Sequence, residues 1–258
     1  MDYFSRAATK ETKFPGELKA GSRGINVRRL QEWLGLQGFP VVIDGDFQAA
    51  TGMALNLYRE HLGLPTSNTL DAESWSALVT PMQELLAIKA LDGQMTTYTQ
   101  AVLELALKHA ERRPVEIGGQ NCGPWVRAYM SGNQGANWPW CAGFVTSIAS
   151  QAAEIMGVPC PLPRTFSCDV LAKDAQNSRR FRAERKFSEA ELTDCHVFIA
   201  RKTPNDWTHT GFAFAPSGKA FRTIEGNTND DGSREGYEVV LRTRTADSKD
   251  FIDLGLIN

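Results

Sequence analysis

The sequence of 258 residues lacks the features that would assign it at once to a membrane, secreted or nucleic-acid-binding class. No stretch approaches the about 18 consecutive apolar residues of a membrane-spanning helix, so we expect no integral membrane segment. Residues 1–6 do not join a basic stretch to an apolar one, so we expect no secretory signal and synthesis in the cytoplasm. With 28 Lys and Arg against 30 Asp and Glu, the formal charge is −2, and we expect no nucleic acid partner.

Cysteine and histidine are also scarce, and their spacing argues against disulfide frameworks and metal sites. Five cysteines at irregular spacing leave at least one thiol unpaired within the chain. There is no CxxC pair and the four histidines lie far apart, so we expect no metal and no cofactor. The cysteines are Cys122, Cys141, Cys160, Cys168 and Cys195, and the histidines are His61, His109, His196 and His209.

The composition that remains is that of a globular protein, with 42% hydrophobic and 22% charged residues. Residues 1–20 are polar and without periodicity, and we expect them to form a loose leader. Apolar residues at helical spacing predict a small module of short helices over 21–80, starting near Ile25, over 48–62 and after Asp71. A linker over 81–95 is expected to join it to a larger domain over 96–258.

The larger domain changes character along its length. Helical spacing predicts helices over 97–112 and 141–156, the second ended by Gly157. Beyond residue 192, alternating segments predict strands over 197–200, 209–215, 220–225 and 237–242, with a turn over 216–219. Helices followed by antiparallel strands predict an α+β fold.

The helical module carries a recognisable set of motifs. They are Gly21-x-x-Gly24-x-x-Val27-x-x-Leu30-Gln31, Asp44-Gly45-Asp46-Phe47-x-x-x-Thr51, Gly63-Leu64 and Trp75-x-x-Leu78. In order and spacing this stretch resembles the three-helix peptidoglycan-binding domain of bacterial and phage wall enzymes. The resemblance implies a peptidoglycan partner. A helical module that only docks on the neighbouring domain is the alternative interpretation.

Cys141 is the first candidate catalytic residue, because it falls where the helix over 141–156 begins. Unpaired backbone N–H groups and the helix dipole favour a thiolate at that position, and the same N–H groups can hold an oxyanion. A small buried structural cysteine is the alternative.

A thiolate nucleophile needs a base, and His209 lies on a predicted strand beside Gly211. If 216–219 form a four-residue loop, Ala215 pairs with Ala220 and His209 opposes Gly226. Glu225 or Asn227 would then lie next to the His209 ring and fix its tautomer.

The motifs around Cys141, His209, Glu225 and Asn227 resemble those of the CHAP family, cysteine-dependent amidohydrolases and peptidases that cut peptidoglycan. Further matching runs are Asn121-x-Gly123-Pro124-x-Val126-x-x-Tyr129, Trp140-Cys141-Ala142-x-Phe144-Val145 and Asp194-x-x-Val197-Phe198. The resemblance implies a papain-like α+β core. It implies Cys141 as nucleophile, His209 as base and then acid, Glu225 as the residue that orients the ring, and Asn227 as a polar support.

These observations predict a peptidoglycan amidase or endopeptidase that acts on the cell wall after release or delivery. A phage endolysin and an injected antibacterial effector both fit, and an effector would be accompanied by a neutralising immunity protein. A thiol amidase acting on a small cytoplasmic peptide conjugate is one alternative. A wall-binding protein without catalytic activity is the other. The oligomeric state is left open.

Overall fold

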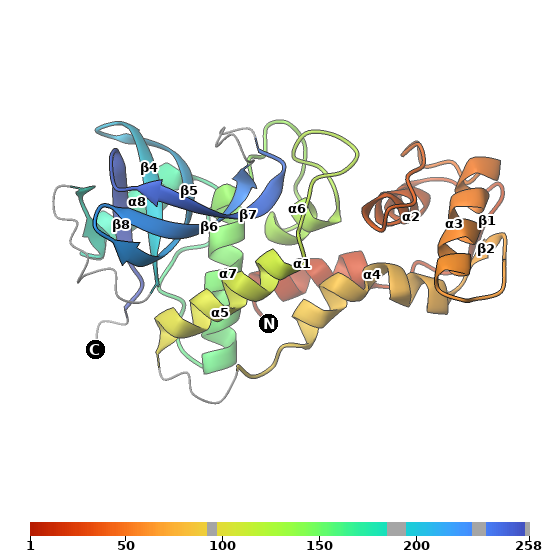
Figure 1. Cartoon of the computed structure of the whole chain (residues 1–258), viewed down its shortest axis with the longest axis horizontal. Coiled ribbons are helices and arrows are strands. Elements are labelled where there is room, and N and C mark those ends of the chain that lie inside the picture. Colours follow the sequence, from red (N-terminus) through yellow and green to blue (C-terminus); the bar gives the residue numbers. More distant parts are fainter. Residues whose placement is uncertain (92–96, 185–194, 229–235, 256–258) are drawn as a thin grey trace.

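The computed structural model describes residues 1–91, 97–184, 195–228 and 236–255, and within them the chain has a mixed α+β fold, as expected (Figure 1). Its helices are α1 (Tyr3–Thr12), α2 (Ile25–Leu36), α3 (Ala49–His61), α4 (Ala72–Ala87), α5 (Tyr98–Glu111), α6 (Pro124–Tyr129), α7 (Cys141–Met156) and α8 (Cys168–Asn177). Its strands are β1 (Leu18–Lys19), β2 (Thr69–Leu70), β3 (Phe181–Arg182), β4 (Cys195–Thr203), β5 (Asp206–Ser217), β6 (Ala220–Thr228), β7 (Glu238–Thr245) and β8 (Lys249–Asp253).

The predicted helical module is present as α2, α3 and α4. Asp71 caps α4, because its carboxylate accepts a hydrogen bond of 2.8 Å from the backbone N–H of Ser74. The expected linker is corrected in part. α4 continues through Pro81 to Ala87, and residues 92–96 lie outside the described residues.

The expectation of a loose leader over residues 1–20 is wrong, because residues 3–12 form α1. Asp2 caps this helix by accepting a 2.8 Å hydrogen bond from the N–H of Ser5. Phe4 is fully buried, and its ring centroid lies 4.7 Å from that of His109 on α5. α1 packs against α4, α6 and α7. Tertiary packing stabilises a segment whose own sequence contains few large apolar residues.

The predicted strands are confirmed as parts of an antiparallel sheet of six described strands in the order β3-β8-β4-β5-β6-β7 (Figure 1). α5, α7 and α8 pack against this sheet. The ring of Phe144 on α7 lies 6.0 Å from that of Phe212 on β5. A smaller apolar cluster joins Phe198, Ala213, Phe221, Ala246 and Phe251. The strands β3 and β8 and the short helices α6 and α8 were not predicted.

The predicted register between β5 and β6 is wrong, by two residues at the turn and by one residue at Phe212. Ser217, not Ala215, pairs with Ala220, and Phe212 pairs with Ile224. The turn is therefore shorter than expected, and an irregularity between Phe214 and Ser217 absorbs the difference, with Ala215 at a φ of 47°. If the Phe212–Ile224 register is continued, Thr210 rather than His209 comes opposite Gly226, and His209 comes opposite Asn227.

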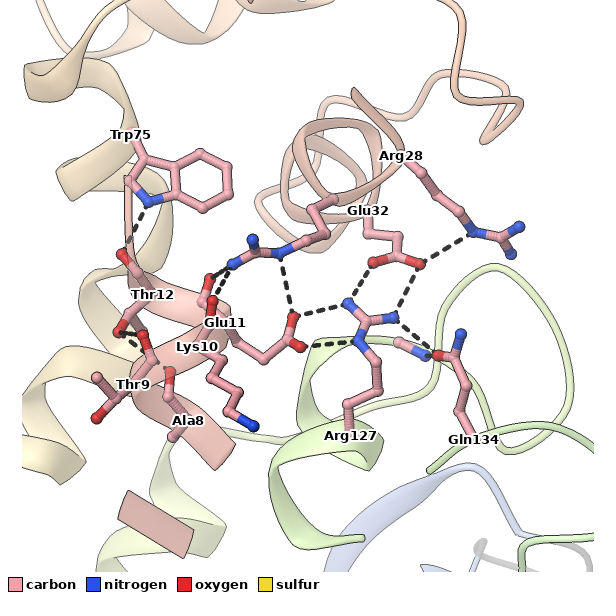
Figure 2. A network of polar contacts seen from close by, with 12 residues as sticks. Ala8, Thr9, Lys10, Glu11, Thr12, Arg28, Glu32, Trp75, Arg127 and Gln134 are labelled. Atoms are coloured by element: carbon pink, nitrogen blue, oxygen red, sulfur yellow. Dashed lines mark hydrogen bonds and ion pairs between the residues drawn. The ribbon is translucent and has the colours of Figure 1, made fainter. Parts of the chain in front are cut away.

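A buried ion network joins three parts of the chain that are far apart in the sequence (Figure 2). Arg127 on α6 donates bonds of 2.9 and 2.8 Å to the carboxylate of Glu11 on α1. It also donates bonds of 2.7 and 3.2 Å to Glu32 on α2. A further bond of 2.8 Å reaches the side-chain oxygen of Gln134, in the segment that leads to Cys141. The helical module is thus held against the rest of the protein through fully satisfied buried charges.

Apolar contacts support the same junction. The ring centroids of Trp33 on α2 and Trp125 on α6 lie 6.2 Å apart. A Cβ atom added at Gly35 would lie 2.5 Å from the Cδ1 atom of Ile117, so this glycine permits the close approach of α2. In the part of the chain that the structure describes, no helix is both long and apolar enough to cross a membrane.

We predict that Arg127→Met destabilises the protein by about 3–5 kcal/mol, because it leaves the buried carboxylates of Glu11 and Glu32 without their main partner. Urea denaturation at neutral pH measures this change. Arg112→Met is the matched control, since its ion pair with Glu84 is largely exposed, and it should cost less than about 1 kcal/mol. Equal effects of the two substitutions would contradict the structural role of the network.

Candidate active site

Cys141 is the first residue of α7, as the sequence predicted, and its side chain is buried. The preceding Trp140 fixes the start of the helix. Its indole stacks on the ring of Tyr129 with an interplanar angle of 4° and donates a 2.7 Å hydrogen bond to Glu116. Gly143 allows α7 to approach the end of α6, because a Cβ atom there would lie 2.9 Å from the carbonyl oxygen of Tyr129.

His209 and Glu225 are in direct contact. The Nε2 atom of His209 lies 2.8 Å from Oε2 of Glu225, and both side chains are buried. Since an ionised carboxylate only accepts, Nε2 carries the proton and Nδ1 is the nitrogen left for other chemistry. Gly211 makes the contact possible, because a Cβ atom there would lie 2.9 Å from Cγ of Glu225. Glu225 thus holds the ring as expected, although the register that suggested this contact was off by one residue.

Two side chains that the sequence analysis did not single out hold Glu225 in place. Arg244 on β7 donates bonds of 2.5 and 2.6 Å to the two carboxylate oxygens. Thr223 donates a third, of 2.5 Å. Burial alone would raise the pKa of Glu225, but the bonds from Arg244 and His209 outweigh it and lower the pKa to about 2. Glu225 is therefore an anion throughout the neutral range.

Cys141 and His209 influence each other's ionisation. Burial acts to lower the pKa of His209, but interactions with Cys141 and Glu225 outweigh it and raise the pKa to about 9. Within the described residues, Nδ1 of His209 is buried and has no hydrogen-bond partner of ordinary geometry. A thiolate and an imidazolium are the forms that these shifts favour at neutral pH.

The pKa of Cys141 is held well below its usual range. The largest cause is a hydrogen bond from Cys168, which outweighs the burial that opposes ionisation, and His209 and the backbone N–H of Ala142 add to the effect. Cys168 is the first residue of α8, and its sulfur lies 3.9 Å from that of Cys141. The sequence gives no signal of this contact, because the two cysteines are 27 positions apart and begin different helices.

Asn227, the fourth predicted residue, lies two positions after Glu225 on β6 and is 2% exposed. Its φ is 55°, a left-handed conformation that asparagine tolerates better than most residues. The structure thus brings Cys141, His209 and Glu225 into one buried cluster, with Asn227 close to it in the chain. No group of three His, Cys, Asp or Glu side chains able to hold a metal ion occurs within the described residues.

Comparison of the chain with protein-family models, with curated proteins and with solved structures found no match.

We predict that Arg244→Gln lowers the free energy of unfolding by about 3 kcal/mol at neutral pH, because it leaves the buried Glu225 anion without its strongest partner. The folded pKa of Glu225 is depressed from 4.5 to about 2, so the ion pair stabilises the fold fully above pH 4.5 and less as the pH falls towards 2. Urea denaturation should therefore show a difference between variant and wild type that shrinks over this range.

Arg222→Gln is the control for Arg244. Its guanidinium is exposed and lies over the ring of Phe214 at 5.4 Å. A small change that does not vary between pH 2 and 4.5 is expected. The proposed clamp is contradicted if Arg244→Gln shows the same small, pH-independent change.

We also predict that iodoacetamide alkylates Cys141 at pH values well below the pKa of an ordinary thiol. Peptide mass spectrometry can follow Cys141 and, as an internal reference, Cys160, whose thiol pKa is raised by burial. His209→Gln should move the alkylation of Cys141 to higher pH, since it removes the adjacent cation. An unchanged pH profile would show that His209 does not sustain the thiolate.

Proposed function

We propose that the protein is a cysteine-dependent peptidoglycan hydrolase that cleaves an amide bond of the wall stem peptide. The observation that carries the proposal is the buried cluster in which a helix-terminal Cys141 interacts with His209, and His209 with Glu225. These residue types, in this chain order, fill the roles of nucleophile, base and orienting group. Together with the motifs of residues 115–242, they support membership of the CHAP family and a papain-like core for the α+β fold.

The reaction we propose is acyl transfer through a thioester. The thiolate of Cys141 attacks the amide carbonyl carbon, and backbone N–H groups at the start of α7 stabilise the oxyanion. Nδ1 of His209 donates its proton to the leaving amine, and the carbon–nitrogen bond breaks. The same nitrogen then takes a proton from water, the resulting hydroxide attacks the thioester carbonyl, and the carbon–sulfur bond breaks. This releases the acid and restores the Cys141 thiolate beside protonated His209. Glu225 keeps its charge throughout because Arg244 holds it as an anion.

The helical module supports the choice of substrate through its resemblance to peptidoglycan-binding domains. Its α2 helix is occupied by contacts with the catalytic part, since Glu32 bonds Arg127 and Trp33 meets Trp125. α3 carries exposed apolar side chains, Met53 and Leu57, and borders a groove of about 570 Å³ that also reaches Asn56 and Asn68. We propose that wall binding uses this side of the module, so that docking and wall binding occur together and raise the local substrate concentration.

The site of action follows from the substrate. We propose that the protein works on the cell wall after release or delivery, as a phage endolysin or as an antibacterial effector. In the second case an immunity protein would protect the producing cell.

The test is mass spectrometry of the soluble products released from purified peptidoglycan. Wild type should release free stem peptides if it is an amidase, and shortened or separated stems still attached to sugar if it is an endopeptidase. Cys141→Ala should release none, and His209→Ala at least about a hundredfold less than wild type. Cys160→Ala, which removes a thiol that contacts Tyr98 instead, is the matched control and should retain activity.

Other results would overturn the proposal. Products that appear equally with Cys141→Ala would exclude the thiol mechanism. No products from wild type, with binding to the wall intact, would favour a binding protein. No products and no wall binding would favour a thiol amidase acting on a small peptide conjugate.

A further inference from the structure

The pair of thiols at Cys141 and Cys168 has a geometry that the proposed hydrolysis does not require. Their sulfur atoms lie 3.9 Å apart, and the two side chains are 4% and 7% exposed. A disulfide bond is about 2.05 Å long, so the sulfurs need to approach by roughly 2 Å, a distance within the reach of side-chain rotation. Cys141 is the first residue of α7 and Cys168 is the first residue of α8. Neither residue therefore has a turn of its own helix before it in the chain.

The remaining cysteines have different surroundings. Cys122 donates to the carbonyl oxygen of Gln120, Cys160 lies 4.0 Å from the hydroxyl of Tyr98, and Cys195 contacts the carbonyl oxygen of His196. All five cysteines lie within the described residues, and none is in a disulfide bond. The Cys141–Cys168 pair therefore combines a candidate nucleophile with a second thiol placed to react with it.

We propose that Cys141 and Cys168 form a reversible disulfide when a peroxide oxidises the protein, and that this bond blocks the proposed active site. The loss of activity rests on the proposed function, whereas formation of the bond rests only on the geometry of the two thiols. The pair is thus a modification site. A peroxide oxidises the two thiols to the disulfide, and a dithiol reduces the disulfide again.

The chemistry balances in two steps. The thiolate of Cys141 attacks one oxygen of hydrogen peroxide, the oxygen–oxygen bond breaks, and Cys141 becomes a sulfenic acid while hydroxide leaves and takes up a proton. The sulfur of Cys168 then attacks the sulfur of the sulfenic acid. The sulfur–sulfur bond forms, and the sulfenic hydroxyl leaves as water with the proton of the Cys168 thiol. In sum, two thiols and one hydrogen peroxide give one disulfide and two waters.

The polar surroundings suit the first step. A thiolate, and not a thiol, reacts with peroxide, and Cys141 begins a helix whose N–H groups and dipole favour the anion. His209 adds a positive charge beside it. The adjacent Cys168 captures the sulfenic acid before a second peroxide can carry it to the irreversible sulfinic acid.

The test uses the full chain, treated with a small excess of hydrogen peroxide, alkylated, digested without reduction and analysed by mass spectrometry. We expect one cross-linked peptide pair that joins Cys141 to Cys168, lighter by two hydrogens than the separate peptides and lost after dithiothreitol. Cys168→Ser should form no such pair, and its Cys141 should advance to the sulfinic acid. Cys195→Ser, which changes another buried thiol, should still form the pair.

Activity on peptidoglycan is measured on the same samples. In wild type it should fall in proportion to the fraction of cross-linked chains and return after dithiothreitol, whereas in Cys168→Ser it should fall and not return. A wild-type protein whose Cys141 is oxidised to sulfinic acid, or linked to a different cysteine, overturns the proposal.

The two proposals fail in different ways. If the cross-linked pair forms but wild type never cleaves peptidoglycan, the modification site stands and the proposed function fails. If cross-linked protein remains fully active, Cys141 is not the nucleophile and the blocking role is overturned. If activity depends on Cys141 but no pair forms, the hydrolase stands and the disulfide is overturned.

Discussion

The buried guanidinium of Arg127 is the constraint on which the arrangement of this protein depends. It is 7% exposed, so the protein needs anions close to it, and Glu11 and Glu32 supply them from α1 and α2. α6, which carries Arg127, is followed directly by the segment that ends at Cys141. Through Gln134, which also accepts from the N–H of Gly123, the same network holds that segment (Figure 2). The position of the helical module and the approach to the candidate active site are thus set by one group of charges.

In the candidate active site, too, each buried charge lies beside a charge of opposite sign. In the ionisation state that the pKa shifts favour, Cys141 is an anion, His209 a cation, Glu225 an anion and Arg244 a cation. Neighbouring charges alternate in sign along this row, and their sum is zero. Without Arg244, the three inner groups would leave a net negative charge in the interior, which favours protonation of the thiolate or of Glu225. Arg244 therefore allows the reactive ion pair to exist where burial alone would remove it.

Local signals made the helices easiest to predict from the sequence. The helix over 141–156 was predicted with the bounds that α7 has, because its start at Cys141, its apolar spacing and its stop at Gly157 all belong to one continuous segment. The cap of α4 by Asp71 was equally local. In contrast, α1 escaped prediction, because the apolar surface that makes it fold belongs to α4, α6 and α7. The contact of His209 with Glu225 was predicted although the register was not. If the observed register is continued, His209 comes opposite Asn227, and Glu225, two positions along the same strand, lies on the same face of the sheet. Arg244 and Cys168 reach the site from elements distant in the sequence, and a single sequence carries no sign of such pairings.

The attachment of the helical module has a consequence for exchanging parts between proteins. Proteins that join a small module to a larger domain invite chimaeras in which the module is exchanged. Replacing residues 21–80 would remove Glu32 and Trp33 together. Arg127 would then lose one of its two anionic partners, and the indole of Trp125 would lose its contact with Trp33. A successful donor would have to bring an acidic residue followed by an aromatic one on its first helix. The residues at positions 32 and 33 therefore decide which modules can be joined to the larger domain of this protein.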